Sequence, residues 1–221
     1  MTHTSTGGWL LAFGLALNCA LVAPAAAAEA VGTVQKVEKT VYGTLPQAAR
    51  APLRAKDDLV AQEVVQTAEE SAALIRFIDR AQLTLGGDAR IAIEEFTFVP
   101  GTEGGKALFR VSGGALRWVS GDLPDGGVRF ATPSADLVLH DANFALRVAP
   151  NGDTLLAVAA GEVDVTVTAS GKTGTVVAGE SLLISPTEVK ALSAGIAATG
   201  DRIVDLGWPA PPTGMMSGSD K

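Results

Sequence analysis

Cysteine is almost absent from this chain, because Cys19 is the only one among 221 residues. A single thiol cannot form a disulfide within the chain, so cross-linked scaffolds are excluded. Cys19 lies in an N-terminal apolar stretch, where Asn18 stands in place of the small residue that a lipoprotein signal needs directly before its cysteine. We therefore expect no lipid attachment, and stability that comes from apolar burial.

Positive charge and aromatic side chains are also scarce. Lys and Arg total 17 against 24 Asp and Glu, which gives a net charge of −7. An acidic chain lacks the basic patches that nucleic acids and anionic lipid surfaces require, so we expect neither as a partner. Aromatic residues make up 5% of the chain, too few to assemble an evident carbohydrate-binding groove.

No apolar run is long enough to cross a bilayer, which takes about 20 residues. The longest, Trp9–Val22, spans 14 residues and precedes Pro24 and an alanine run with Ala26 and Ala28 placed as small cleavage-site residues. This pattern predicts a secretory signal peptide over residues 1–28, cleaved after Ala28, and hence a periplasmic or extracellular protein. Removal of 28 of the 221 residues leaves 193, enough for one sizeable core.

Short alternating segments dominate the rest of the chain. In residues 163–168 valines alternate with polar residues, which places one set of side chains in a core and the other in water. Such segments recur between Gly, Pro, Asn and Asp turns, and Asn151-Gly152 is a strong hairpin signal. They predict strands at 29–43, 83–87, 90–99, 107–111, 115–119, 128–131, 135–140, 144–148, 154–158, 163–168, 174–177 and 181–184.

Residues 56–79 are ambiguous. Val60, Val64, Ala68 and Ile75 have near-helical spacing, and by itself this favours an amphipathic helix, although the second half of the segment alternates as a strand does.

A short motif is repeated near the C-terminal end. Ala160-Gly161-Glu162 recurs 18 residues later as Ala178-Gly179-Glu180, and this interval matches the length of a short β-helical turn. The tail at 208–221, rich in Pro, Gly and Ser, is expected to be disordered.

Several landmarks occur in an order that resembles the FecR domain family of bacterial envelope proteins, which includes sensors that relay iron-chelate uptake to sigma factors. The resemblance covers about residues 30–185. Its landmarks are Val64-Val65-Gln66-Thr67, Ser71-Ala72-Ala73-Leu74-Ile75-Arg76-Phe77-Ile78-Asp79, Leu83-Thr84-Leu85-Gly86, Ser112-Gly113-Gly114-Ala115-Leu116, Ala131-Thr132-Pro133-Ser134-Ala135, Gly161-Glu162-Val163 and Ala178-Gly179-Glu180.

The resemblance implies a single all-β domain over residues 29–207, β-helical or sandwich-like, in which Ser71–Phe77 is a strand. We adopt the strand, because tertiary pairing overrides propensity in short segments. Asp141-Ala142 departs from the family, which usually has Gly-Thr there, so the local turn is an open question. Family sensors carry a cytoplasmic part and a membrane span. The apolar span here is the removable signal, so we do not expect this chain alone to signal across a membrane.

Residues suited to catalysis are few. His140, the one histidine after residue 28, shares a strand face with Asp136 and Val138, and no Gly-x-Ser-x-Gly elbow accompanies it. The acidic pairs at 57–58, 69–70 and 94–95 point to opposite faces if they lie in strands, and no calcium-loop motif is present. We predict no catalytic, cofactor-binding or metal-binding residue.

The sequence leaves three hypotheses for function. The first is a non-catalytic, FecR-like envelope domain that contacts another envelope protein or a polysaccharide, for which open strand edges provide one means. The second is a glycan-active enzyme that uses two distant carboxylates such as Asp136 and Asp164. The third is a structural, assembly-forming unit, suggested by the 18-residue repeat.

Overall fold

A computed structural model describes residues 29–102, 104–186 and 189–192. This part of the chain is entirely β-structure, with 15 strands joined in one sheet, so the all-β prediction is confirmed. Within it there is no helix that is long and apolar enough to span a membrane. The predicted signal peptide and the tail at 208–221 lie outside the described residues.

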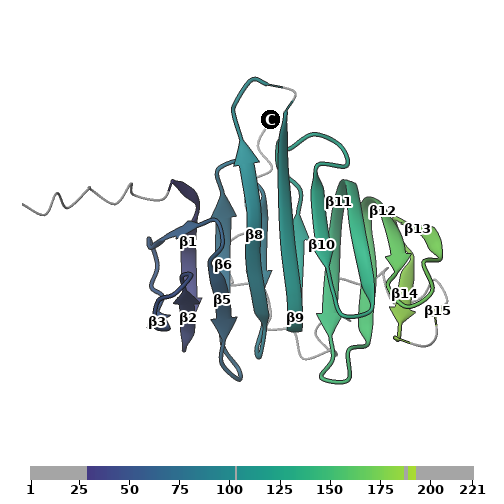
Figure 1. Ribbon diagram of the computed structural model, residues 1–221, viewed down its shortest axis with the longest axis horizontal. Coiled ribbons are helices and arrows are strands. Elements are labelled where there is room, and N and C mark those ends of the chain that lie inside the picture. Colours follow the sequence, from purple (N-terminus) through teal and green to yellow (C-terminus); the bar gives the residue numbers. More distant parts are fainter. Residues whose placement is uncertain (1–28, 103, 187–188, 193–221) are drawn as a thin grey trace, which may run out of the picture.

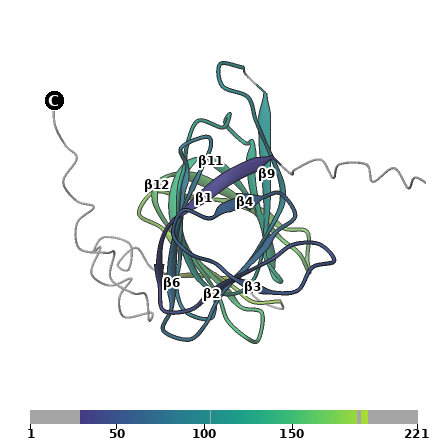
Figure 2. The same cartoon turned by 90° about the vertical axis from the view of Figure 1, so that its left-hand side faces the viewer.

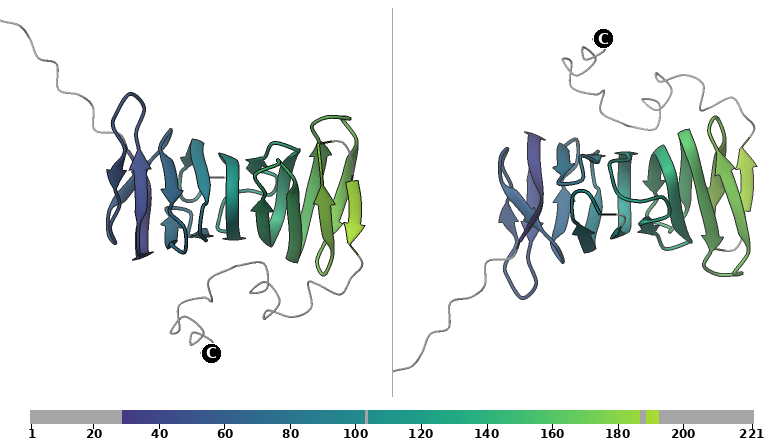
Figure 3. Two further views of the ribbon diagram at one scale, coloured as in Figure 1. Left: turned by 90° about the horizontal axis from the view of Figure 1, so that it is seen from below. Right: turned by 90° about the horizontal axis from the view of Figure 1, so that it is seen from above.

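The strands follow one another along the long axis of the molecule (Figures 1 and 3). The first eight are β1 Ala30–Glu38, β2 Val41–Thr44, β3 Ala51–Pro52, β4 Asp58–Val60, β5 Val64–Thr67, β6 Ala72–Phe77, β7 Gln82–Leu85 and β8 Arg90–Phe98. The remaining seven are β9 Gly105–Val119, β10 Val128–Ala131, β11 Ala135–Val148, β12 Thr154–Val167, β13 Thr173–Val177, β14 Ser181–Ile184 and β15 Val189–Leu192.

The pairings fold this sheet into two layers around one interior, as the view along the axis shows (Figure 2). The first layer runs β4, β1, β6, β7, the second half of β9, the second half of β11, the first half of β12, β14 and β15. The second layer runs β3, β2, β5, β8, the first half of β9, β10, the first half of β11, the second half of β12 and β13.

The chain crosses between layers at residues with positive φ, a conformation that glycine adopts freely and Asp tolerates. One set of crossings lies at Lys39, Glu70, Asp88 and Gly114, and another at Asp141, Gly161 and Gly179. The two sets occupy opposite borders of the sheet. The second half of β11 runs from the bend at Asp141 to Val148, and Val148 lies opposite Gly114. Gly114 and Asp141 therefore lie at opposite ends of the same strand segment. Asp141, with φ of 46°, therefore makes the bend at the position where the resemblance expects glycine.

The inward side chains form one hydrophobic core between the layers. Its centre is a chain of aromatic rings from both layers, with Phe109 4.9 Å from Phe130 and 5.2 Å from Trp118 between ring centroids. Trp118 and Leu116, which share a strand face, are both fully buried. The core stabilises the fold without cross-links, since each buried aromatic removes a large apolar area from water.

The helical spacing in residues 56–79 was misleading. This segment forms β4, β5 and β6, and Ser71–Phe77 is a strand as the resemblance implies. The alternating residues Ala73, Ile75 and Phe77 are buried against neighbouring strands on both sides of β6. Cross-strand pairing and burial thus override the local helical preference.

Three pairs of predicted strands are single long strands. Residues 107–111 and 115–119 belong to β9, 135–140 and 144–148 to β11, and 154–158 and 163–168 to β12, which ends at Val167. Glycine and polar residues between the halves predict breaks, but in the structure they bend a strand from one layer to the other without ending it. Residues 46–52, whose two prolines favour a loop, also contribute a short strand, since Ala51–Pro52 pairs with β2 as β3.

The 18-residue repeat marks two corners and not a β-helical turn. The chain passes from the first layer to the second at Gly161 and returns at Gly179, and the Ala178 N–H donates to the Gly161 carbonyl at 3.1 Å. All pairings except that of β10 with β9 are antiparallel. A solenoid built from parallel coils is therefore not the arrangement here, and the sandwich-like alternative describes it better.

Candidate functional site

His140 lies on the outer surface of the second layer, at the end of the straight part of β11. Leu137 and Leu139 are buried, so alternation directs His140 outward, as the sequence predicts. The bend at Asp141 follows directly. The imidazole is held against the surface and keeps 27% of its side-chain exposure.

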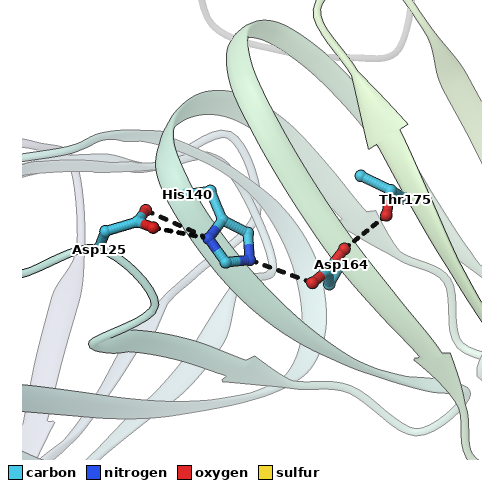
Figure 4. Close-up of polar contacts among 4 residues, drawn as sticks. All are labelled: Asp125, His140, Asp164 and Thr175. Atoms are coloured by element: carbon cyan, nitrogen blue, oxygen red, sulfur yellow. Dashed lines mark hydrogen bonds and ion pairs between the residues drawn. The ribbon is translucent and has the colours of Figure 1, made fainter.

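Two carboxylates flank this imidazole (Figure 4). His140 Nδ1 lies 3.1 and 3.2 Å from the carboxylate oxygens of Asp125, in the turn between β9 and β10. His140 Nε2 lies 3.1 Å from Oδ2 of Asp164 on β12. The hydroxyl of Thr175 on β13 donates to the other oxygen of Asp164 at 2.6 Å. The four side chains form what we call the histidine cluster, which joins one turn to three strands.

The cluster favours the charged forms of His140 and Asp164. The hydrogen bond that the imidazole donates to Asp125, with a smaller contribution from the one to Asp164, raises the pKa of His140 above its usual 6.5, and partial desolvation opposes this rise. The Thr175 hydroxyl and then His140 lower the pKa of Asp164 below its usual range. A protonated imidazole between two ionised carboxylates is therefore the form that this geometry stabilises.

The histidine cluster is poorly suited to nucleophilic catalysis. Both ring nitrogens of His140 already face carboxylates, so neither is free to take a proton from a substrate. The cluster's hydroxyl, on Thr175, bonds Asp164 and not the imidazole, unlike the nucleophile of a catalytic triad. The arrangement can hold strands and a turn together and respond to pH.

Asp136 and Asp164 lie on adjoining strands and both point outward. Asp136 is opposite Thr166 and Asp164 opposite Val138, which makes the two carboxylates diagonal neighbours. A glycosidase of this kind needs one carboxylic acid with a raised pKa, whereas Asp164 has a lowered pKa and accepts hydrogen bonds from two partners. Asp164 therefore does not fit the role of the acid in the enzyme hypothesis.

The acidic pairs are engaged in local contacts. Asp57 accepts a hydrogen bond from the Arg54 backbone at 2.7 Å. Three glutamates form ion pairs, Glu70 with Lys39, Glu94 with Arg110 and Glu95 with Lys106, at 2.5 to 2.8 Å. Within the described ranges no group of three or more His, Cys, Asp or Glu side chains is placed to hold a metal ion.

A second feature is a basic surface on the outer side of the first layer, which sequence reasoning missed. Arg76, Arg117 and Arg147 project from β6, β9 and β11, and we call this surface the arginine face. Arg117 lies opposite Ala145, so it is a diagonal neighbour of Arg147, about 7–8 Å away between Cα atoms. Residues 72–77, 82–85, 114–119, 143–148 and 154–158, which build this part of the layer, include no Asp or Glu.

The arginine face has fewer carboxylates on its own strands than the second layer has. Among the described residues, Arg76 and Arg117 have no ion-pair partner, and both are exposed. On the second layer Arg110 and Lys106 pair with Glu94 and Glu95 of the neighbouring strand, whereas Arg90 and Arg129 are exposed and have no ion-pair partner in the described part of the chain. Both layers thus carry unpaired arginines, and what distinguishes the arginine face is that the strand segments that build it include no Asp or Glu.

Asp125 and Thr175 also escaped the sequence analysis. Alternation places His140 and Asp164 on outward faces, but Asp125 belongs to a Pro-Asp-Gly-Gly turn that predicts a bend and no partner. Neither the neighbouring position of β12 nor the hairpin that carries Thr175 follows from local pattern. Strand order was the missing information.

Comparisons with known proteins found only distant similarity in structure. No protein-family model and no curated protein matches the chain. It is similar to crystal structures at 2.50 and 1.65 Å of a "putative anti-sigma factor" from Parabacteroides distasonis, with 13% and 16% identity and TM-scores of 0.46 and 0.47. Each match covers 58% of this chain and 57% of the other, less than two thirds of that protein. Such a likeness carries no conclusion about function.

Proposed function

We propose that this chain is a FecR-like, non-catalytic domain of the bacterial cell envelope that works by binding the acidic surface of another envelope protein. Membership of the FecR family is supported by the ordered landmarks in residues 64–180, and export by the leader-like residues 1–28. A link to sigma-factor regulation or iron uptake rests on the resemblance alone.

The arginine face is the observation that carries this proposal. Its guanidinium groups offer planar forks that fit carboxylates in two-point contacts, and Arg is enriched at protein interfaces. Small side chains lie beside them, with Ala145 opposite Arg117 and Ala157 opposite Ala145. A surface of this kind attracts a negatively charged partner and speeds its association, more strongly at low salt.

Charge reversal tests the proposal. We expect Arg76→Glu with Arg117→Glu to abolish cross-linking to the partner in envelope extract, while Arg110→Glu on the second layer leaves it intact. Binding by the parent protein should weaken as salt rises, because the contact is electrostatic. Equal capture of the partner by the Arg76→Glu, Arg117→Glu double variant and by the Arg110→Glu control would contradict the proposal. Loss of retention on an acidic polysaccharide, without loss of a protein partner, would assign the surface to a polymer.

The non-catalytic part of the proposal is tested separately. Asp136→Asn with Asp164→Asn removes the two carboxylates that the enzyme hypothesis requires. We expect no glycan turnover by the parent protein, and equal partner binding by this variant. Measured turnover that disappears in the variant would replace the binding proposal with the enzyme.

A further inference from the structure

The connection between β9 and β10, residues 120–127, leads from the first layer to the second, and we call it the strap. It runs along the border of the sheet that also holds the bend of β11, because the Ser120 hydroxyl donates to the Ala142 carbonyl at 2.9 Å. Leu123, near its middle, is partly buried and packs against the hydrophobic core. The strap therefore covers one border of the interior.

Asp79, in the turn between β6 and β7, holds the first part of the strap. Its backbone carbonyl accepts a hydrogen bond from the Asp122 N–H at 2.8 Å. Its Oδ1 accepts one from the Ala81 N–H at 3.1 Å. The Asp79 side chain is fully buried, and its Oδ2 makes no hydrogen bond to any described residue. A carboxylate oxygen in that position is costly to keep charged, because neither water nor a donor compensates it.

Gly121 of the strap lies directly against this oxygen. A Cβ atom at Gly121 would be 2.8 Å from Asp79 Oδ2, closer than real Cβ atoms approach. The same Cβ would overlap the Asp79 carbonyl oxygen, so a glycine is required for the strap to lie this close. The strap thus contributes the cover that keeps Oδ2 from water. Moving the strap away would let water reach the carboxylate.

The charge of Asp79 therefore depends on the position of the strap. Burial raises the pKa of Asp79 above its usual 3.8, backbone N–H groups oppose this rise, and the charge of Asp122 adds to it. Asp122 itself pairs with Arg80, which lowers the pKa of Asp122, so this ion pair persists in mildly acidic and neutral solution. The closed strap thus favours protonated Asp79, and ionisation of Asp79 favours the open strap.

His140 holds the last part of the strap through Asp125 (Figure 4). The other charged group that faces the imidazole is Asp164, whose pKa is lowered and which therefore stays ionised in mildly acidic solution. The Gly126 N–H donates to the Leu139 carbonyl at 3.0 Å beside this contact. Protonated His140 attracts Asp125, and loss of the proton at higher pH removes that attraction.

We propose that the strap is a pH-dependent latch, closed in mildly acidic solution and opened locally over residues 121–126 as the pH rises. The two points of attachment act in the same direction, because ionised Asp79 gains water when the strap leaves and neutral His140 no longer holds Asp125. Opening uncovers Leu123. The hydrogen bond from the Ala107 N–H to the Gly127 carbonyl, at 2.9 Å, and the one from Ser120 keep the two ends of the strap in place.

Hydrogen exchange of the full chain measures this opening. The readouts are the protection factors of the Asp122 and Gly126 amides, which are corrected for the intrinsic effect of pH on exchange. We expect both factors to fall about tenfold or more from about pH 5 to about pH 8, while core amides of β9 and β11 keep theirs. Protection of the strap that is constant, or that falls together with the core, would overturn the latch.

Variants separate the two points of attachment. Asp79→Asn keeps the shape of the side chain without its charge, so the Asp122 amide should stay protected at about pH 8. His140→Gln should lose protection at Gly126 already at about pH 5. Asp136→Asn, on the outer surface of β11, is the control and should behave as the parent does. A parent-like fall at Asp122 in the Asp79→Asn variant would contradict the proposal.

Titration of the Asp79 carboxyl carbon by NMR in the parent protein gives a test that needs no substitution. We expect the ionisation of Asp79 and the loss of protection at Asp122 to occur over the same pH range, because each favours the other. An Asp79 that is fully ionised at about pH 5 while the Asp122 amide remains protected up to about pH 8 would show that its charge does not open the strap.

Discussion

At the residue scale, the histidine cluster gives the protein a defined response to pH. The pKa of His140 is raised in the folded state, so its protonation stabilises the fold fully below about pH 6.5 and ceases to do so as pH rises through the folded value. The pKa of Asp164 is lowered, so its contribution is lost as pH falls through that value. The cluster is strongest between these limits, in mildly acidic solution.

Titration of the His140 ring by NMR checks this account. We expect Asp125→Asn to lower the pKa of His140 most and Asp164→Asn to lower it less, because Asp125 makes the larger contribution. Asp136→Asn, on the same strand face, is the control and should leave the titration unchanged. Since both partner carboxylates are largely exposed, each contact contributes only about 0.2–1 kcal/mol to stability. An unchanged pKa in the Asp125 variant would contradict the observed geometry.

Glycine at a corner makes a second prediction at this scale. A Cβ atom at Gly161, where φ is 70°, would lie 2.3 Å from the Asp141 carbonyl oxygen. We therefore expect Gly161→Ala to lower the free energy of unfolding by more than about 2 kcal/mol. Gly171 has φ of 64° and open space around it. Gly171→Ala should cost only about 1 kcal/mol, from backbone strain alone. Denaturant unfolding measures the free energy of unfolding of both variants. The difference between them gives the cost of the steric clash at Gly161 beyond that of backbone strain, which both positions share.

At the element scale, long strands that bend between layers were the feature least evident from sequence. Alternation identified both halves of β9, β11 and β12, but Gly113-Gly114 and Asp141-Ala142 look like turns in a linear pattern. A bend and a turn use the same residues, because both need positive φ. Only the partner strands, which continue past the bend, distinguish the two.

Substitution at the β11 bend tests its backbone requirement. Asp141→Gly removes the cost of a non-glycine residue at φ of 46°, and this gain is partly offset by the greater freedom of glycine in the unfolded chain. We expect a stability change between zero and about 1 kcal/mol in favour of the variant. Asp136→Gly, in the extended part of the same strand, should instead destabilise by about 0.5–1 kcal/mol. Equal losses of stability in the Asp141→Gly and Asp136→Gly variants would argue against a bend that depends on positive φ at Asp141.

At the scale of the whole molecule, a single core joins both layers and all parts of the described chain. Phe109 on β9 contacts four other aromatic rings, those of Phe77, Phe96, Trp118 and Phe130, and the five rings come from four strands, β6, β8, β9 and β10. We expect Phe109→Ala to destabilise by about 3–5 kcal/mol while unfolding stays one cooperative transition. Val99→Ala, at an exposed site, should change stability by less than about 0.5 kcal/mol. Two separate transitions would show that the layers fold apart.

The sequence by itself determined the β class, most strand positions and the direction in which each strand residue points, because alternation is a local consequence of the pleated backbone. It also placed His140 on the same strand face as Asp136 and Val138. Tertiary structure decided that β4 and β5 replace a plausible helix, since burial between neighbouring strands outweighs local propensity, whereas the strand at β6 was already implied by the resemblance. Tertiary structure likewise brought Asp125, His140, Asp164 and Thr175 together and aligned three arginines, because strand order sets which distant residues become neighbours.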